Sequence, residues 1–209
     1  MTENAKPDVE ELYTAAQNTT NLTVDPDERG AADFLIAAAW SPSRLGSAML
    51  RLHSEWDAAA KPVKPTAASI DAIASTMGKN ARGEAYAIAM RWYEGGLINL
   101  LGKLQTLPHV RDQVAHKAEE WGYADAQTKA SVIVKYWLDQ TCHPCAGLKW
   151  RAVPNAPALS NRLCPSCGGT GLSMVPYGSE GKRLANYMDD CVQVARTSIK
   201  KRLHSYPKA

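Results

Sequence analysis

Long apolar runs are absent from this chain of 209 residues, and so are the usual signatures of enzyme active sites. No apolar stretch approaches the roughly 18 residues that a membrane-spanning helix requires. The chain has no phosphate-binding glycine loop, no Gly-x-Ser-x-Gly motif and no His-Glu-x-x-His motif, and its five histidines never stand at metal-ligand spacing from one another. We therefore expect no membrane partner, no small-molecule substrate and no enzymatic activity.

Phenylalanine is also scarce, with one residue against six tryptophans and eight tyrosines, although the hydrophobic content of 45% is ordinary. The length suits one large domain or one domain with appendages, and it also allows two compact modules. No signal-like segment opens the sequence, and four of the five cysteines stand at metal-ligand spacing. These features predict a protein of the reducing cytoplasm.

Acidic residues are few in the C-terminal third of the chain. The net charge of +3 hides an asymmetry, because residues 1–33 hold eight acidic and two basic residues, whereas the remainder holds 13 acidic and 22 basic ones. From Cys142 onward, ten lysines and arginines face three acidic residues. This imbalance indicates a polyanionic partner, and the alternative is a merely solvated basic surface. The acidic N-terminal segment meets a partner, masks the basic part, or is a mobile tail.

The strongest chemical signal is a pair of Cys-x-x-Cys motifs, formed by Cys142, Cys145, Cys164 and Cys167. Each motif lets two thiolates of one tight turn reach the same ion, and the eighteen residues between the motifs lie within the range of four-thiolate zinc sites. No Asp or Glu lies between the first and the last cysteine, so we expect one structural Zn²⁺ and not a catalytic one. Two disulfides or a thiol redox couple are the alternatives, but a redox motif needs no second pair.

The turns of the two motifs differ in glycine content. Gly168, Gly169 and Gly171 follow the second pair, where a chain that wraps closely around a metal needs positive φ angles. Only Gly147 follows the first pair, so we expect its turn to be less tightly constrained. His143 is interpreted as a turn residue or as an outer hydrogen-bond donor to a ligand. The excursion between the pairs starts with Trp150 and Arg151 and continues through a turn-rich loop over 153–162, which either docks a partner or covers the metal.

Helical periodicity dominates the rest of the sequence and predicts a mainly α fold with an inserted four-cysteine zinc-finger unit. We expect a short helix over residues 8–17, a helix with Ser41 as N-cap and Pro42 as its first residue, and a helix between Thr66 and Gly78. A helical stretch over 82–104 follows, and we expect an interruption at Gly95 and Gly96. A hairpin over 108–140 then turns at Gly122, and a final helix covers about 180–204.

Two of these helices carry apolar stripes at core spacing. The first stripe consists of Leu45, Met49, Leu52 and Trp56, and the second, in the final helix, of Leu184, Met188, Cys191, Ala195, Ile199 and Leu203. The fifth cysteine belongs to the second stripe and is interpreted as a small core hydrophobe and not as a metal ligand.

Two helix pairs are compatible with a helix-turn-helix, which places its second helix in the major groove of DNA. In the pair over 66–104, Lys79, Arg82 and Arg91 are the expected polar contacts. In the pair over 108–140, the turn resembles that of DNA-binding helix pairs, but Thr128 and Ser131 occupy positions where apolar residues are expected.

The final helix supplies the candidate DNA contacts, which are the cations that flank or oppose its apolar stripe: Lys182, Arg183, Arg196, Lys200, Lys201 and Arg202. Phosphate contacts from such residues position a protein on DNA without reading sequence. The alternative is that cations late in a helix only offset its dipole.

The expected organisation has four parts. An acidic, partly flexible segment over 1–33 precedes a helical region over 34–141. A zinc-binding unit over 142–175 follows, and a basic C-terminal helix over 176–209 packs back on the helical region.

Four features follow one another along the chain: helices that lead into a Cys-x-x-Cys pair, a basic excursion, the sequence CPSCGGTG and a basic helical end. In the order of these features the chain resembles the zinc-containing, lambda-like branch of the Q-type late-gene transcription antitermination proteins of lambdoid phages. The resemblance covers roughly residues 70–209 in organisation, and only the cysteine and glycine elements match as motifs. The same cysteine and glycine element occurs in the zinc domain of DnaJ chaperones. However, this chain has no His-Pro-Asp motif of a J-domain and does not repeat the element four times.

The resemblance implies a mainly helical, non-enzymatic protein of the bacterial host cytoplasm, with Cys142, Cys145, Cys164 and Cys167 as zinc ligands. It also implies a helix-turn-helix that binds double-stranded DNA near a phage late promoter, and contact with bacterial RNA polymerase, which then reads through pauses and terminators. A zinc-stabilised protein-interaction or chaperone-like module without DNA binding is the alternative function.

Overall fold

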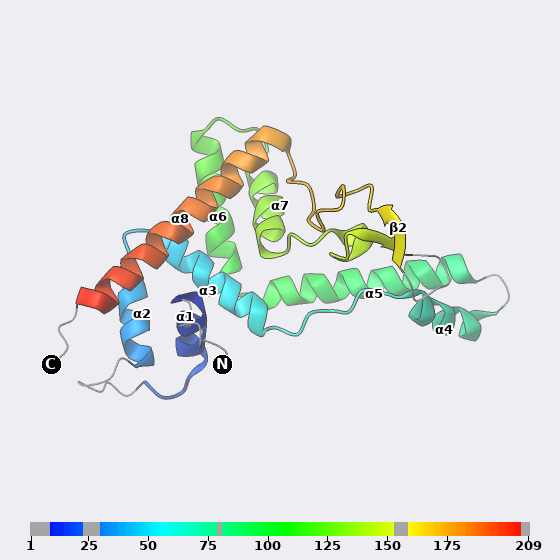
Figure 1. Cartoon of the computed structure of the whole chain (residues 1–209), viewed down its shortest axis with the longest axis horizontal. Helices are drawn as coiled ribbons and strands as arrows, with labels where there is room; N and C mark the ends of the chain where they lie inside the picture. The colour runs from blue at the N-terminus through cyan, green and yellow to red at the C-terminus, as the bar shows by residue number, and fades with distance from the viewer. Residues whose placement is uncertain (1–8, 23–29, 79–80, 153–158, 206–209) are drawn as a thin grey trace. The chain divides into compact units, whose positions relative to one another are not determined.

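The computed structural model of the chain describes residues 9–22, 30–78, 81–152 and 159–205 and confirms the expected mainly α fold (Figure 1). Its helices are α1 (Val9–Asn18), α2 (Ala31–Ala39), α3 (Arg44–Ala58), α4 (Ala67–Met77), α5 (Arg82–Lys103), α6 (Leu107–Glu120), α7 (Ala126–Leu138) and α8 (Gly178–Ser205). A short 3-10 turn, η1 (His143–Cys145), precedes the two strands β1 (Trp150–Ala152) and β2 (Leu159–Leu163). No helix among the described residues is long and apolar enough to cross a membrane.

The chain divides into two compact units. The helical unit comprises Met1–Trp56, Thr106–Asp139 and Val175–Ala209. The cysteine unit comprises Asp57–Gln105 and Gln140–Met174. This division cuts the range 34–141 at residues 57 and 105 and places α4 and α5 in the same unit as the cysteines.

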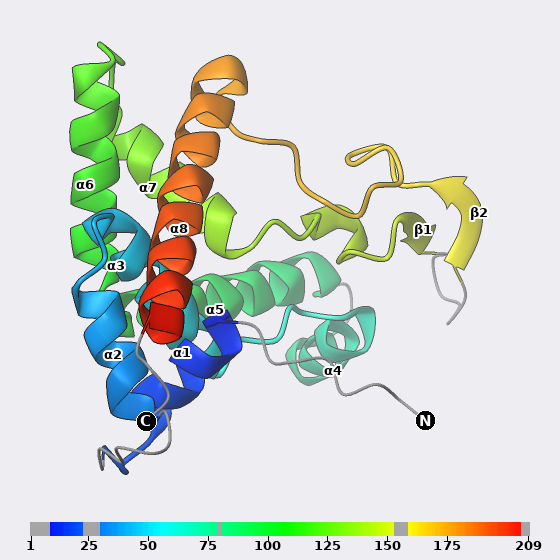
Figure 2. The same ribbon diagram turned by 60° about the vertical axis from the view of Figure 1, so that its left-hand side comes forward.

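The core of the helical unit forms around α8, which packs against α1, α2, α6 and α7 (Figures 1 and 2). The predicted stripe of α8 is buried at Leu184, Met188, Ala195, Ile199 and Leu203. Full burial of each large apolar side chain contributes about 1.5–3 kcal/mol. The interpretation of Cys191 needs a correction, because this residue is only half-buried and the next residue, Val192, takes the buried position.

Polar contacts join α8 to α7 at two levels of the core. Near the start of α7, Lys129 forms an ion pair with Glu180. Near its end, Nε1 of Trp137 donates a hydrogen bond of 2.8 Å to Asp189. These contacts fix the register between the two helices, because each pair lies about two turns from the other along both helices.

The predicted apolar face of α3 is confirmed, since Leu45, Met49, Leu52 and Trp56 are all buried. The predicted start of this helix is wrong. The helix begins at Arg44, and Oγ of Ser43 caps it by accepting a hydrogen bond of 3.1 Å from the backbone N–H of Gly46. Ser43 is the N-cap because its oxygen reaches an N–H group that has no partner within the helix.

The hairpin of α6 and α7 turns at Gly122, as predicted, with φ at +74°. The N–H of Gly122 donates to the carbonyl of Glu119 at 2.8 Å, and that of Tyr123 to the carbonyl of Ala118 at 3.0 Å. This pair of hydrogen bonds is a Schellman motif, which satisfies the last carbonyls of a helix when a left-handed residue follows. Val110, Val114 and Ala118 are fully buried on the inner face of α6.

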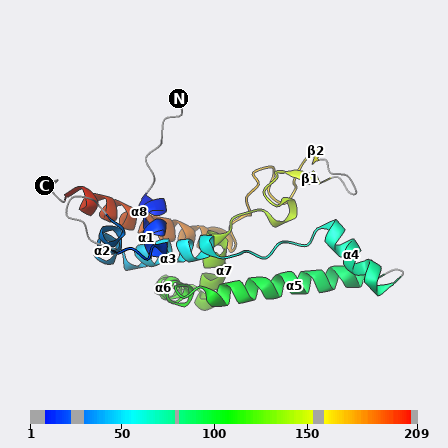
Figure 3. The ribbon, with the colours of Figure 1, turned by 90° about the horizontal axis from the view of Figure 1, so that it is seen from below.

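In the cysteine unit, α4 folds back along α5 (Figure 3). Thr66 caps α4 as predicted, because its side chain accepts a hydrogen bond from the N–H of Ser69, and Gly78 ends the helix with φ at +107°. The predicted interruption at Gly95 and Gly96 is wrong, since α5 runs through both residues. Glycine lowers helix stability by about 1 kcal/mol relative to alanine but does not by itself break a helix.

Gly46 of α3 lies close against the backbone of α8, and this contact generates a stability prediction. A Cβ atom at Gly46 would collide with the backbone carbonyl of Cys191. We therefore expect Gly46→Ala to destabilise the helical unit by at least about 2 kcal/mol, because backbone atoms cannot move aside as a flexible side chain can. Thermal unfolding followed by circular dichroism measures the change.

The matched control for this substitution is Gly95→Ala, because a Cβ atom at Gly95 meets nothing within 4 Å. We expect this variant to be as stable as the parent or more stable by about 0.5–1 kcal/mol. Equal stability of the Gly46→Ala variant and the parent would contradict the close helix approach.

Candidate functional site

The four cysteines of the two motifs form one buried cluster. Each is at most 8% exposed, and their sulfur atoms all lie within 4.8 Å of one another. The Sγ atoms of Cys142 and Cys164 are 3.9 Å apart, and those of Cys145 and Cys167 are 3.7 Å apart. Four sulfurs at 2.3 Å from a tetrahedral ion stand about 3.8 Å from one another, whereas a disulfide brings two sulfurs to about 2.05 Å. The geometry therefore fits a shared metal ion and not two disulfides.

The donor set determines which chemistry the cluster can perform. Within the described part of the chain, no histidine or carboxylate joins the four sulfurs in a potential ligand group. Four thiolates suit a soft or borderline ion such as Zn²⁺ and leave no position for water or substrate. The arrangement can hold a metal and brace the chain, and it lacks the open coordination site of catalytic zinc.

The two motifs follow the same backbone path, although their sequences differ. In each motif, φ is positive at the first, second and fourth residues after the second cysteine. After Cys145 the angles are +47° at Ala146, +79° at Gly147 and +70° at Lys149. After Cys167 they are +59° at Gly168, +85° at Gly169 and +79° at Gly171. The two turns therefore share their φ pattern, while a Cβ atom would meet its nearest neighbour at 3.3 Å at Gly147 and at 2.7 Å at Gly169, so the first turn is less crowded. Alanine and lysine occupy left-handed positions in the first turn, where glycine is the usual residue.

Backbone hydrogen bonds relate the two motifs reciprocally. The N–H of Cys142 donates to the carbonyl of Gly171, and the N–H of Cys164 donates to the carbonyl of Lys149, both at 2.9 Å. In each case the first cysteine of one motif donates its N–H to the fourth residue after the second cysteine of the other motif. The cluster is thus a pseudo-symmetric pair of turns. Aligning the sequences CHPCAGLK and CPSCGGTG could have revealed this equivalence.

Backbone groups and burial set the acidity of the thiols in opposite directions. For Cys142, burial raises the pKa, because charge is costly away from water. For Cys167, burial also raises the pKa, but backbone hydrogen bonds from Gly171 and Gly169 help to lower it below its ordinary value. The N–H of Gly171 lies 3.3 Å from the sulfur of Cys167. A bound cation would hold all four sulfurs as thiolates, which is the form that ligates metals.

The segments that enter and leave the cluster are tied together. Thr141 pairs with Leu172 in an isolated antiparallel bridge. The N–H of Ser173 donates a hydrogen bond of 2.8 Å to the carbonyl of Gln140, and its hydroxyl donates one of 2.9 Å to the carbonyl of Thr141. The insertion between α7 and α8 therefore closes at its base, as expected for a metal-braced unit.

Part of the predicted turn-rich loop is instead a β-ribbon. The strands β1 and β2 pair antiparallel, with Trp150 opposite Leu163 and Ala152 opposite Leu159. The prediction for residues 159–162 is wrong, because these residues lie in β2, which pairs with β1 through an irregular register. Residues 153–158 lie outside the described part, as do the side chains of His143 and Arg151.

The six candidate DNA contacts on α8 do not form one patch. Lys182 and Arg183 lie in its first two turns, and the other four lie between Arg196 and Arg202. A rise of about 1.5 Å per residue separates the ends of this set by about 30 Å. Two separate basic surfaces result, one at each end of the helix.

The basic surface at the start of α8 includes an aromatic cluster that sequence reasoning missed. The guanidinium of Arg183 lies 4.1 Å from the ring centre of Trp121, which packs edge-on against Tyr123 and Tyr187. Lys117 lies 5.7 Å from the same indole. These contacts bring the α6–α7 turn and the start of α8 together. Spacing along the chain gave no signal for them, because they join different helices.

A polar face on α7 lies beside this cluster. Its exposed polar residues, at helical spacing of three and four, are Gln127, Thr128, Ser131 and Lys135. Val132 is exposed among them, and α7 contains no acidic residue. The positions of Thr128 and Ser131, which conflicted with a buried apolar pattern, therefore belong to an exposed face. The ion pair between Lys129 and Glu180 places the start of α8 next to the start of this face.

The candidate contacts of the α4–α5 pair are arranged differently. Arg82 forms a salt bridge of 3.1 Å with Asp71, and Arg91 is exposed. Lys79 lies outside the described residues. The structure does not join Arg82 and Arg91 in one cluster, since nine residues of helix separate them, or about 14 Å.

Comparison of the chain with protein-family models, curated proteins and solved structures gave no match.

The pseudo-symmetry predicts opposite effects for two exchanges at equivalent positions. In Lys149→Gly, the new residue adopts positive φ without strain, so we expect metal affinity to be unchanged or higher by up to about tenfold. In Gly171→Lys, φ is +79° and the new Cβ would lie 2.8 Å from the carbonyl oxygen of Gly147, so we expect a loss of at least about tenfold. Competition between each full-length variant and a chromogenic chelator for Zn²⁺ measures both affinities. Losses of equal size in the two variants would disprove the equivalence.

Proposed function

We propose that the protein is a phage late-gene transcription antitermination factor. It binds promoter-proximal double-stranded DNA and bacterial RNA polymerase in the host cytoplasm and lets the polymerase read through pauses and terminators. It has no enzymatic activity of its own. The observation that carries the DNA-binding part is the acid-free polar face of α7 beside the basic start of α8. The polymerase part rests on the resemblance of the cysteine and glycine elements to Q-type antitermination proteins.

The face of α7 has the composition of a helix that reads bases. An α-helix fits the major groove of B-DNA, where a glutamine can pair with adenine and a threonine methyl can contact thymine. Gln127 and Thr128 stand at the exposed start of α7, where recognition helices make most of their base contacts. The hydroxyl of Ser131 donates to the carbonyl of Gln127 at 2.8 Å, which leaves its oxygen as an acceptor.

The cations around this face suit phosphate contacts. Lys182 and Arg183 are exposed near the start of α8, and Lys135 continues the face of α7. Trp121 holds the guanidinium of Arg183 over its ring, so less side-chain freedom is lost when that group meets a phosphate. In this arrangement the lysines and arginines supply affinity and salt dependence, and the α7 face supplies sequence preference.

The metal is one structural Zn²⁺ in this proposal. Cys142, Cys145, Cys164 and Cys167 hold it, and it supplies the cross-link that keeps both turns closed. The cluster lies between the end of α7 and the start of α8, so the metal closes the insertion that connects the two helices of the DNA-binding surface.

A specific observation favours a second function, a zinc-stabilised protein-interaction or chaperone-like module. Several large apolar side chains of the cysteine unit are exposed, among them Leu148, Leu163, Leu172 and Met174, and Met174 is 80% exposed. Exposed apolar side chains that cluster on one module are typical of surfaces that bind other proteins. In that function the protein would shift no duplex DNA even at low salt.

The zinc assignment predicts that Cys164→Ser loses the metal. Three thiolates bind Zn²⁺ more weakly than four, so the dialysed variant should contain well below one zinc per chain, and the cysteine unit should unfold more easily. Elemental analysis after dialysis against a mild chelator measures the stoichiometry. The control is Cys191→Ser, which lies outside the cluster and should keep one zinc per chain. Full zinc content in a well-folded Cys164→Ser variant would contradict the site.

The DNA assignment predicts that Ser131→Asp weakens binding to a late-promoter duplex by at least about tenfold, because a carboxylate on the α7 face repels phosphates. Fluorescence anisotropy at low salt measures the affinity. Ala15→Glu adds the same charge to an exposed position of α1 and should leave binding unchanged. Run-off transcription through a terminator tests the complete proposal, since the parent should raise readthrough and Ser131→Asp should not. If the parent leaves readthrough unchanged, the antitermination proposal fails.

A further inference from the structure

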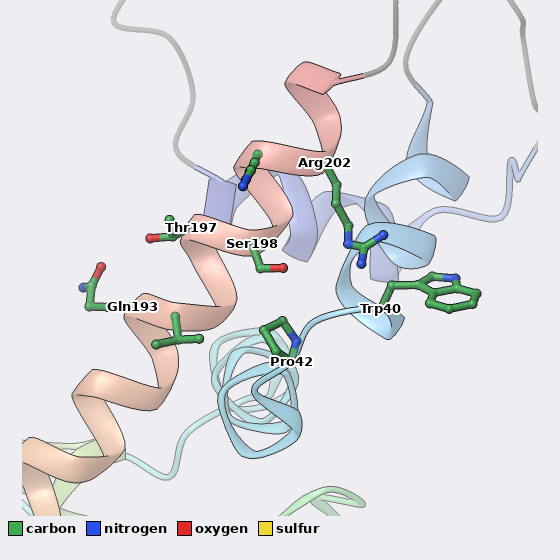
Figure 4. A pocket seen from close by; sticks show the side chains of 8 residues that line it. Trp40, Pro42, Gln193, Thr197, Ser198 and Arg202 are labelled. Carbon is green, nitrogen blue, oxygen red and sulfur yellow. The ribbon is translucent and has the colours of Figure 1, made fainter.

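A groove lies between the end of α2 and the second half of α8, away from the α7 face (Figure 4). Its volume is about 750 Å³. The residues that line it are Trp40, Pro42, Gln193, Val194, Thr197, Ser198, Lys201 and Arg202. Along α8 they recur at spacings of one and three, which is one continuous face of the helix.

The apolar part of this groove is unusually exposed for residues of its kind. Trp40 is 67% exposed and Val194 is 49% exposed. Ile36, one turn before Trp40 on α2, is also exposed and extends the apolar surface. Large aromatic residues in this state are typical anchors of protein interfaces, where a few tryptophans and arginines supply most of the binding energy.

The polar part of the groove carries charge of one sign. Lys201 and Arg202 are both exposed lining residues. Among the residues that the structure describes, no acidic one lines the groove, and α8 has none after Asp190. The guanidinium of Arg202 reaches from α8 towards Trp40 and lies 5.8 Å from its ring centre (Figure 4). Positive charge therefore stands directly beside an exposed apolar surface, and a complementary ligand combines an apolar group with negative charge.

We propose that this groove, the α2–α8 groove, binds a short acidic segment of a partner protein. An apolar side chain of the segment packs against Trp40 and Val194, and its carboxylates pair with Lys201 and Arg202. Gln193, Thr197 and Ser198 offer hydrogen bonds to its backbone or polar side chains. The lining residues of α8 span about 14 Å, which matches about three turns of a partner helix or about four extended residues.

The groove fits a protein segment better than a single-stranded nucleic acid. Single strands bind through several aromatic rings on which successive bases stack. Trp40 is the single aromatic side chain among the described lining residues, and the guanidinium of Arg202 already lies near its ring. Most of the remaining surface is aliphatic or neutral, which favours the side chains of a peptide over consecutive phosphates.

This inference does not depend on DNA binding. The groove residues of α8 start ten residues after Arg183, so about 15 Å of helix separates them from the proposed phosphate contacts. A protein could occupy the groove while α7 contacts DNA. Failure of one surface would leave the other intact, and the two proposals can be tested separately.

The test selects binders from a random library of peptides of about 12 residues on the full-length, zinc-loaded chain. We expect the selected sequences to combine Asp or Glu with Leu, Phe or Trp. The affinity of a synthetic selected peptide should fall at least about tenfold in Trp40→Ala and in Lys201→Glu. Lys182→Glu makes the same charge change near the start of α8, outside the groove, and should leave peptide affinity unchanged.

Circular dichroism checks that each variant keeps the parental fold, which is expected because both changed side chains are exposed. Selected peptides without acidic residues, or peptides that bind both groove variants as tightly as the parent, would overturn the proposal. A labelled single-stranded oligonucleotide that loses affinity in the same two variants would assign the groove to nucleic acid instead. Concentration-dependent self-association that Trp40→Ala abolishes would assign it to a second copy of the chain.

Discussion

Burial of the apolar face of α8 is the interaction on which the helical unit depends. This helix is the common neighbour of α1, α2, α6 and α7, and Leu184, Met188 and Ile199 are fully enclosed between them. Because the stripe fixes the rotation of α8, all of its six candidate cations except the half-buried Arg196 are exposed. The start of the helix then faces the α6–α7 turn, and its end faces α2. Two candidate surfaces therefore arise from the packing of one helix.

The cysteine cluster is a constraint of a different kind, because its four buried sulfurs lie close enough together to share a metal ion. Its two halves use the same three positive φ angles and exchange equivalent backbone hydrogen bonds, although one half contains lysine and alanine where the other contains glycine. A left-handed residue other than glycine costs about 1–2 kcal/mol, and four bonds to a shared metal ion would offset that cost at Lys149 and Ala146.

The candidate surfaces combine a cation with an aromatic ring in two places. Arg183 lies over Trp121, and Arg202 lies near Trp40. The first pair is packed within a cluster of tyrosines and stabilises a turn beside a polar helix face. The second borders an open groove next to exposed apolar residues. The same chemical pair therefore supports different proposals, because its surroundings differ in burial and in the polarity of the neighbouring helix.

The sequence by itself determined the helical class, the buried face of α3, the cap at Thr66, the turn at Gly122 and the four cysteines, because each depends on periodicity or spacing within one short segment. It misplaced the start of α3, which Ser43 caps, and it assigned to a loop the residues that pair in β2. It also predicted an interruption at Gly95 and Gly96, where α5 is continuous because glycine by itself does not break a helix. Only the tertiary structure decided that the six cations of α8 form two surfaces, that Trp121 and Trp40 each lie beside one of them, and that both cysteine turns share one path. These features join segments far apart in the chain, and no local pattern encodes which helices meet.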